Sequence, residues 1–264
     1  EKAIAINPRD AATWSNLAVY AGRTGDHARV VSAASRAIEL DPKNVGAHTN
    51  RGIARSGLGD EKGAMADLSR AIELEPTAGN YHNRAVARRI LGGDQEPALA
   101  DVEKALALDP QHAGARTFRG LARVDRGDDR GGIEDLSAAI ELGADSPEVR
   151  FQRGFARLKL EDANGAIEDA EWLIGRKPTA RAYIMRARAY LAQGRYSEAA
   201  PDFDKAVELD PADIEVYLNR GAFMATVGAR DRAVADARKV IELAPRSPQA
   251  DGARRMLEQL GEKP

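Results

Sequence analysis

A six-residue phrase of the form AIELDP recurs along the chain at steps of 33 or 34 residues. Its closing positions are Pro42, Pro76, Pro110, Ala144, Pro178, Pro211 and Pro245. A second phrase, related to NRGIAR, lies upstream of each of the last six copies, and a turn that contains Gly separates the two. Because Gly favours the conformation that ends a helix and Pro cannot continue one, each step predicts two short helices. Such units bury their apolar faces on their neighbours, so the period predicts a stack without a single core.

The composition agrees with a thin apolar layer in every unit. The chain has 264 residues, of which 50 are Ala, while aromatic residues make up 5%. The chain has no Cys, which excludes disulfides and thiolate metal sites, and a net charge of −2 disfavours nucleic acid as a partner. No apolar run is long enough to span a membrane. Arg outnumbers Lys 30 to 9, a bias that, with the Ala excess, favours a GC-rich bacterial gene and leaves cytoplasm and periplasm open.

The repeat resembles the tetratricopeptide repeat (TPR) family, most completely in the sixth unit. The residues that fit the family motif there are Tyr183, Ala187, Tyr190, Ala199, Phe203 and Ala206. The resemblance implies an all-α fold, a right-handed α-solenoid or superhelix of about seven helix-turn-helix repeats with a C-terminal capping helix. We expect the seven repeats to lie within 11–246, at about 11–44, 45–77, 78–112, 113–146, 147–179, 180–213 and 214–247. Residues 1–10 are expected to end a preceding partial repeat, and 248–264 to form the capping helix and tail.

Two rows of opposite charge accompany the repeat. Arg stands at motif position 7 in six repeats: Arg51, Arg84, Arg119, Arg153, Arg186 and Arg220. The same repeats have Asp at position 23: Asp67, Asp101, Asp135, Asp169, Asp202 and Asp236. The first repeat has Leu17 and Ala33 instead, so both charges are present together or absent together. This pattern predicts a partly buried ion pair within each repeat, with ligand contact as the less favoured alternative.

A further set of arginines has no single acidic row that matches it. These residues stand at positions 11 and 4, and they are Arg55, Arg88, Arg116, Arg123, Arg150 and Arg157. One interpretation is that they pair with scattered acids such as Asp125, Asp128 and Glu134, or lie in solvent. The other is a basic stripe that binds an anionic polymer.

The family resemblance implies that the first helix of each repeat lines a concave groove. Side-chain amides recur at position 6, and an amide offers the donors and acceptor that a peptide backbone needs. Apolar residues follow in the fourth to sixth repeats. The candidate groove residues are Asn16, Asn50, Asn83, Phe118, Leu121, Phe151, Gln152, Phe155, Ile184 and Asn219. The alternatives are amides that contact only water and apolar side chains that pack between repeats. The family's dicarboxylate clamp is excluded around Asn50, because Ser15, Val19 and Gly46 do not match it.

No catalytic constellation or phosphate-binding loop is present, and none of the four His has metal-ligand spacing. His48 and His82 stand on the first helices of adjacent repeats, and we expect their neighbouring positions to have no functional meaning. We therefore expect a non-enzyme without cofactor or metal. The favoured function is a scaffold that binds an extended peptide or helix of another protein in the groove, with the oligomeric state open. The alternatives are a regulatory or scaffolding segment of a larger bacterial protein or enzyme, and a binder of an anionic polymer.

Overall fold

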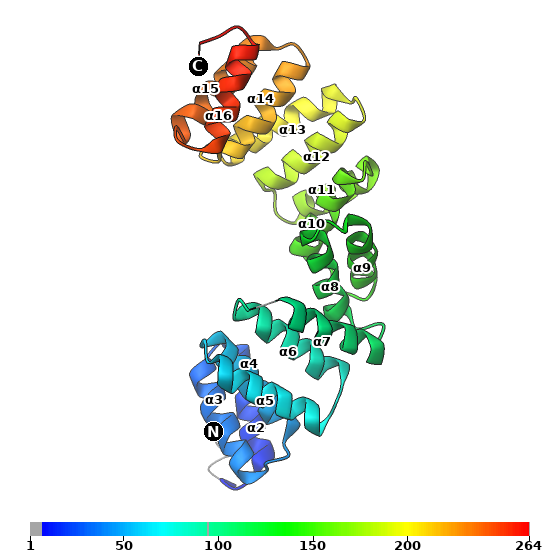
Figure 1. Cartoon of the computed structure of the whole chain (residues 1–264), viewed down its shortest axis with the longest axis vertical. Coiled ribbons are helices and arrows are strands. Elements are labelled where there is room, and N and C mark those ends of the chain that lie inside the picture. Colours follow the sequence, from blue (N-terminus) through cyan, green and yellow to red (C-terminus); the bar gives the residue numbers. More distant parts are fainter. Residues whose placement is uncertain (1–6, 94, 264) are drawn as a thin grey trace. The chain divides into compact units, whose positions relative to one another are not determined.

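The computed structural model describes residues 7–93 and 95–263. Within these residues the chain forms fifteen helices, α2 to α16, which pack as antiparallel pairs (Figure 1). The pairs are α2(Ala11–Arg23) with α3(His27–Leu40), α4(Val45–Gly57) with α5(Glu61–Leu74), α6(Ala78–Ile90) with α7(Gln95–Leu108), α8(Ala113–Asp125) followed by α9(Asp129–Glu141), α10(Pro147–Lys159) with α11(Ala163–Arg176), α12(Ala180–Ala192) with α13(Tyr196–Leu209), and α14(Ile214–Thr226) with α15(Arg230–Leu243). The last helix is α16(Pro248–Gln259). The expected all-α, TPR-like fold is confirmed, while the repeat boundaries stay a prediction. Residues 1–6 of the expected preceding repeat and Pro264 of the tail lie outside the described residues.

Turn chemistry fixes where the helices begin and end. In α3, α5 and α11 an N-cap carboxylate, such as that of Asp60, accepts a hydrogen bond from the backbone N–H three residues later. Before the caps of α5 and α9, which are Asp60 and Asp128, the chain needs a left-handed residue, and Gly59 and Gly127 supply it with φ of 79° and 83°. Glu161 occupies the same turn position after α10 with φ 62°, which is strained for a residue with a side chain.

The helices form two compact units with separate contact networks. The first unit contains Glu1–Arg119 and Leu142–Ala144, and the second contains Gly120–Glu141 and Asp145–Pro264. Each unit has several small buried clusters rich in Ala, in line with the composition. No helix of the described residues is both long enough and apolar enough to cross a bilayer.

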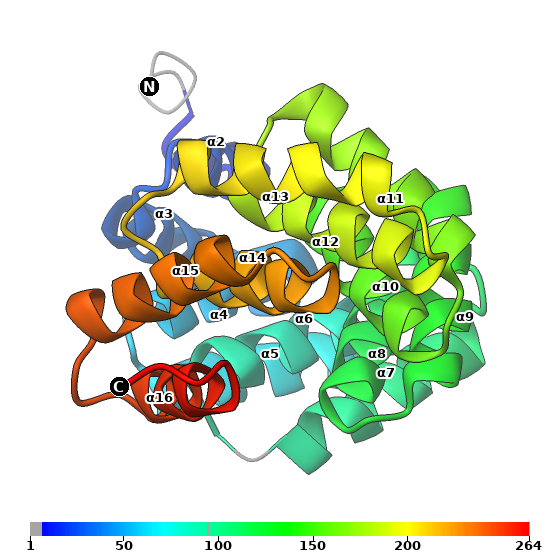
Figure 2. The same cartoon turned by 90° about the horizontal axis from the view of Figure 1, so that it is seen from above.

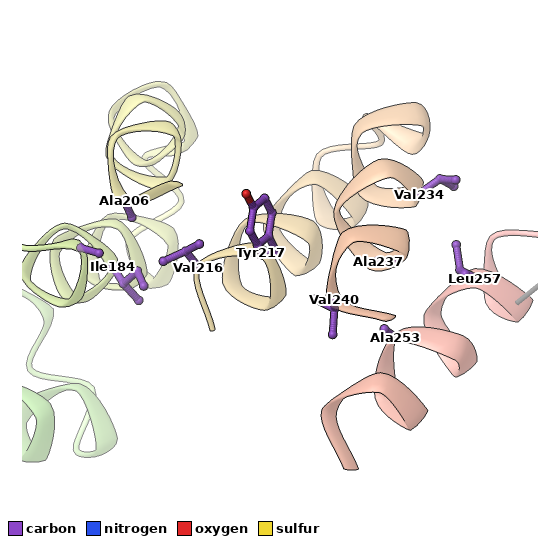
Figure 3. Close-up of a cluster of buried hydrophobic side chains, with 10 residues drawn as sticks. Ile184, Ala206, Val216, Tyr217, Val234, Ala237, Val240, Ala253 and Leu257 are labelled. Carbon is purple, nitrogen blue, oxygen red and sulfur yellow. The ribbon is translucent and has the colours of Figure 1, made fainter. Parts of the chain in front are cut away.

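The last helix covers the apolar face of the pair before it. Its buried residues Ala250, Ala253 and Leu257 face α14 and α15, which lie beside it in the second unit (Figure 2). Leu257 and Ala253 belong to one cluster with Val234 and Val240 (Figure 3). Apolar side chains of the final pair are thereby removed from water, which is the role of a capping element in a repeat stack.

Candidate protein-binding surface

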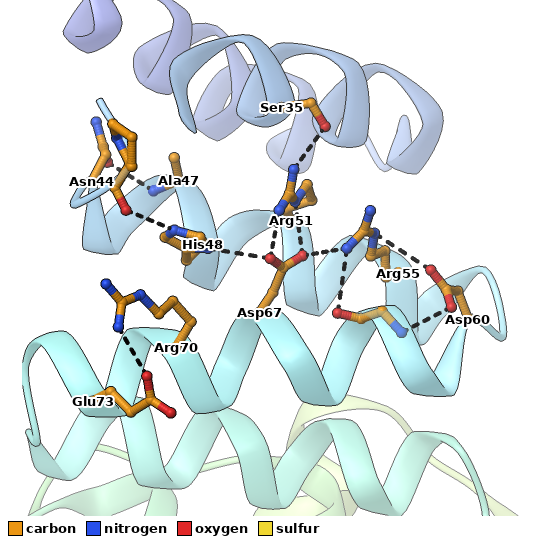
Figure 4. A network of polar contacts seen from close by, with 12 residues as sticks. Ser35, Asn44, Ala47, His48, Arg51, Arg55, Asp60, Asp67, Arg70 and Glu73 are labelled. Carbon is orange, nitrogen blue, oxygen red and sulfur yellow. Dashed lines mark hydrogen bonds and ion pairs between the residues drawn. The ribbon is translucent and has the colours of Figure 1, made fainter. Parts of the chain in front are cut away.

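The charged rows of the sequence form buried ion pairs inside the repeats. Asp67 receives Arg51 in a bidentate arrangement, with Nε–Oδ2 and Nη2–Oδ1 distances of 2.8 and 2.7 Å (Figure 4). The same geometry recurs in four other repeats: Arg84 with Asp101, Arg153 with Asp169, Arg186 with Asp202 and Arg220 with Asp236. The predicted pairing is confirmed in these five repeats. These arginines therefore serve the fold.

The position-11 arginines reach the same carboxylates from the next turn of their helices. Their Nη1 atoms lie 2.7 to 2.9 Å from the Asp oxygens in three repeats, and Arg88 makes the same contact with Asp101. The three pairs with those distances are Arg55 with Asp67, Arg123 with Asp135, and Arg157 with Asp169. The expectation that no acidic row matches these arginines is wrong, because one carboxylate accepts from several donors.

The two position-4 arginines are also engaged. Arg150 contacts Asp145 at 2.8 Å and Asp169 at 3.1 Å, and Arg116 donates to the carbonyl of Pro110 at 2.7 Å. The arginines expected to form a basic stripe thus bind groups of the chain itself. Carboxylates of the chain lie beside Arg55, Arg88, Arg123, Arg150 and Arg157, and the anionic-polymer alternative stays a prediction.

The buried carboxylate of Asp67 is held in the charged state by its contacts. Burial alone raises the pKa of Asp67, but hydrogen bonds from Arg51 and His48 and the charges of Arg51 and Arg55 outweigh it. The pKa of Asp67 therefore lies below its usual value. In turn, the hydrogen bond to Asp202 raises the pKa of Arg186.

The position-7 arginines also connect one repeat to the next. Five of them donate through Nη1 to a side chain of the preceding repeat, as Arg51 does to Ser35 at 3.1 Å (Figure 4). The other contacts of this kind are Arg84 to Ser69, Arg119 to Glu103, Arg153 to Ser137 and Arg220 to Asp204. One guanidinium therefore contributes both to the stability of its repeat and to the contact between repeats.

In the first unit, the asparagines of position 6 lie at matching places on α2, α4 and α6. Asn16 is exposed, and Asn50 and Asn83 are half-buried. Among the described residues none of these three amides has a hydrogen-bond partner. One turn further along two of the helices lie Val19 and Ile53, which are 41% and 37% exposed. The surface therefore combines free amides with accessible aliphatic side chains.

In the second unit, the first helices of three successive pairs line an open apolar pocket of about 150 Å³. Phe151, Phe155 and Leu158 of α10 line it together with Ile184 and Met185 of α12. The rim is polar and consists of Arg181, Arg188, Glu215 and Asn219. The structure thus brings together four of the predicted groove residues and adds three charged ones that the sequence reasoning did not select. These charges stand at motif positions 2 and 9, which the family resemblance places in the groove. Their motif positions could therefore have identified them from the sequence.

The remaining predicted groove residues lie elsewhere. Phe118 is 6% exposed and packs with Ala85 and Val102, while the Arg89 guanidinium lies 4.9 Å from its ring centroid. It is therefore part of the packing between repeats and offers no anchor surface. Leu121 packs against the cluster that contains Leu136, and Gln152 is half-buried on α10.

The histidines pair differently from the approach considered in the sequence. His82 lies against His112, with ring centroids 4.9 Å apart, whereas His48 contacts Asp67 at 3.2 Å. Burial, together with the charges of His112 and Arg89, lowers the pKa of His82 to about 4. Across residues 7–93 and 95–263, no three His, Cys, Asp or Glu side chains cluster as metal ligands do.

Comparison with known proteins gives the same architecture. Residues 151–214 match the family described as Tetratricopeptide repeat. Sperm-associated antigen 1 of Mus musculus is 40% identical over 68 residues, which are 26% of this chain and only 8% of that protein. The crystal structure of the C-terminal part of a TPR repeat-containing protein from Cytophaga hutchinsonii aligns over 90% of this chain and 98% of its own, with TM-score 0.67 and 16% identity. The structure of YrrB, titled a TPR protein with an unusual peptide-binding site, aligns over 71% of this chain and 97% of its own, with TM-score 0.62 and 24% identity.

Proposed function

The chain belongs to the tetratricopeptide repeat family, and from this premise we propose that it is a non-catalytic scaffold that holds an extended segment of a partner protein. Repeat proteins of this family mediate protein–protein interactions, and the scaffold families built from them are generally non-catalytic. YrrB, which shares the fold, is described as having a peptide-binding site. The partner segment would lie against the first helices of successive repeats.

The observation that carries this proposal is the row of unpartnered amides on α2, α4 and α6. The polar atoms of these half-buried amides are not among the buried unpartnered atoms of the described residues, so they reach solvent and can exchange water for a ligand. Asn50 and Asn83 make no hydrogen bond within the described residues, so their donors and acceptors are available to a ligand. An extended peptide presents an N–H and a C=O at each residue, which matches an amide without requiring a particular side chain.

The neighbouring aliphatic residues complete the match. Exposed Val19 and Ile53 lie one helical turn from Asn16 and Asn50, so a peptide bound through its backbone would place side chains against them. Backbone hydrogen bonds supply affinity in this mode and the apolar contacts supply selectivity. Affinity that comes from the backbone and selectivity that comes from a few apolar contacts are what we expect of a scaffold that holds an extended segment.

The test uses random dodecapeptides displayed on phage and selected on the whole chain. The strongest peptide is then synthesised with a fluorescent label and titrated by anisotropy. We expect Asn50→Ala with Asn83→Ala to weaken its binding about tenfold or more, since each amide gives up to two hydrogen bonds. Thermal stability should be unchanged, because the amides bind nothing in the free protein.

The matched control is Asn164→Ala. Asn164 is an exposed asparagine on α11 whose amide oxygen accepts a hydrogen bond from Gln193 at 2.8 Å. This change should leave peptide affinity as it is. Equal affinity for the groove variant and the control would refute the role of the amide row, and failure to select any peptide would refute the peptide-binding function.

A further inference from the structure

The pocket of the second unit combines an apolar lining with arginines that the packing of the repeats does not use. Its walls are apolar, and two arginines of its rim have no acidic partner among the described residues. Arg181 makes no ion pair there, and the guanidinium of Arg188 lies only over the ring of Phe155, at 5.8 Å from the centroid. The position-7 and position-11 arginines of the same unit all contact carboxylates.

We propose that this pocket is a specificity subsite that takes one bulky apolar side chain of the partner peptide, with an acidic residue close by on one or both sides. The proposal rests on the proposed function and adds the chemistry of the ligand. It applies to α10, α12 and α14 only. The amide row on α2, α4 and α6 is a separate surface.

The pocket's size and lining select the apolar part. A cavity of about 150 Å³ with an apolar lining is large enough to hold a group of the size of benzene. A side chain of Leu, Met or Phe is of that size, whereas Ala leaves most of the space empty. Phe155, Ile184 and Met185 supply the contacts, and Met185 adapts to irregular shapes because its side chain is unbranched.

The rim selects the charge. Arg181 and Arg188 stand seven residues apart on α12, about 10 Å along the helix axis, with Ile184 and Met185 between them. An extended peptide advances about 3.3 Å per residue, so carboxylates within two residues of the anchor reach either guanidinium. Glu215 on α14 is the single acid of the rim and leaves it with a net positive charge.

The desolvation argument explains why acids are favoured over neutral residues. Arg188 already lies over an aromatic ring, so its guanidinium loses part of its hydration on that face. A carboxylate from the ligand restores charge compensation through charge-assisted hydrogen bonds, which a hydroxyl or amide provides less well. A basic residue at the same place is disfavoured by repulsion from both arginines, which adds discrimination.

The test compares selections from the same dodecapeptide library. On the wild-type chain, we expect enrichment of peptides in which Leu, Met or Phe has Asp or Glu within two residues. Arg181 and Arg188 are both exposed. On the double variant Arg181→Glu with Arg188→Glu, we expect the selected peptides to have Lys or Arg where those selected on the wild type have Asp or Glu. The control variant is Arg130→Glu, an exposed arginine on α9 outside the pocket, which should keep the wild-type preference.

Titrations of one selected peptide give the magnitudes. Replacing its apolar anchor by Ala should weaken binding about 10- to 100-fold, since the lost contacts lie in an apolar pocket. Charge reversal of the two arginines should weaken the acidic peptide about fivefold or more, and Arg130→Glu should not. Because both arginines are exposed, these variants are expected to fold, which circular dichroism checks.

The outcomes separate this inference from the function on which it rests. Peptides that are selected and depend on Asn50 and Asn83, but show no apolar–acidic preference or no response to charge reversal, overturn the subsite and leave the scaffold function standing. A chain that selects no peptides overturns both. A preference that follows the charge of positions 181 and 188 supports the subsite.

Discussion

The loss of a position-7 arginine should cost more where its Asp has no other cationic partner. Asp202 is 5% exposed and receives Arg186 through two hydrogen bonds of 2.8 Å, and position 11 of that repeat is Tyr190. Asp169 is fully buried and receives Arg150 and Arg157 in addition to Arg153. The chain therefore contains a matched comparison.

For Arg186→Leu we expect a loss of about 3 to 5 kcal/mol in the free energy of unfolding, because an uncompensated carboxylate remains buried. For Arg153→Leu we expect a smaller loss, about 1 to 3 kcal/mol, since two cations still compensate Asp169. The double variant Arg186→Leu with Asp202→Ala should recover much of the loss. It reproduces the apolar pair Leu17 and Ala33, with which the first repeat already folds.

The measurement is urea unfolding followed by circular dichroism, with amide hydrogen exchange in α12 and α13 as the local readout. A local readout is needed because repeats of a stack need not unfold together. The cycle of Arg186 and Asp202 should give a coupling of about 2 to 3 kcal/mol. Strict additivity, or equal losses for Arg186→Leu and Arg153→Leu, would refute the idea that pairing decides the cost.

Three further predictions concern stability. The pKa of His82 is about 4 in the folded chain and 6.5 in the unfolded chain, so the free energy of unfolding should fall as the pH drops from 6.5 to 4. In urea titrations, His82→Gln should abolish about 1 to 2 kcal/mol of that fall, a figure reduced because the ring is partly exposed to solvent. An unchanged pH profile in the variant would contradict this prediction. Glu161→Gly should stabilise by about 0.5 to 1 kcal/mol by relieving a left-handed backbone, whereas Gly127→Ala should destabilise by about 1 kcal/mol; thermal shifts of the same sign would argue against the reasoning. Leu257→Ala should cost about 2 to 4 kcal/mol and accelerate hydrogen exchange in α15 and α16; unchanged protection would show that α16 does not cap the final pair.

Much of the fold could be predicted from the sequence because the same phrases recur at a nearly constant spacing. Pro and Gly mark helix ends chemically, so a periodic arrangement of both fixes element type and length. The Arg–Asp pairs were predictable for a different reason. Arg51 and Asp67 have counterparts in five other repeats, whereas the first repeat has Leu17 and Ala33 at both positions. This joint variation within one chain indicates that the two positions are in contact.

The contacts of the position-11 arginines with the buried Asp row were missed because each acid was matched with a single arginine. A carboxylate has two oxygens with about four acceptor positions, so Asp67 accepts from Arg51 and Arg55 at once. The sequence left Phe118 open between a groove role and packing between repeats, because groove-facing and packing residues share one helical period. The His82–His112 contact involves the residue directly before α8, and the repeat period does not determine the path of such a connection.

The arrangement of arginines separates those that stabilise the stack from those available to a ligand. Positions 7 and 11 of the first helix face the second helix of the same repeat, where a buried Asp holds them. Positions 2 and 9 lie on the other side of the first helix, beyond the reach of that Asp, so a cation there gains no ion pair within its repeat. Arg181 and Arg188 occupy these two positions in the repeat where position 11 is Tyr190. Helix α12 thus carries arginine on the side that lines the pocket, where it stabilises no pair of its own repeat, and we expect it to contribute free energy on binding an acidic ligand.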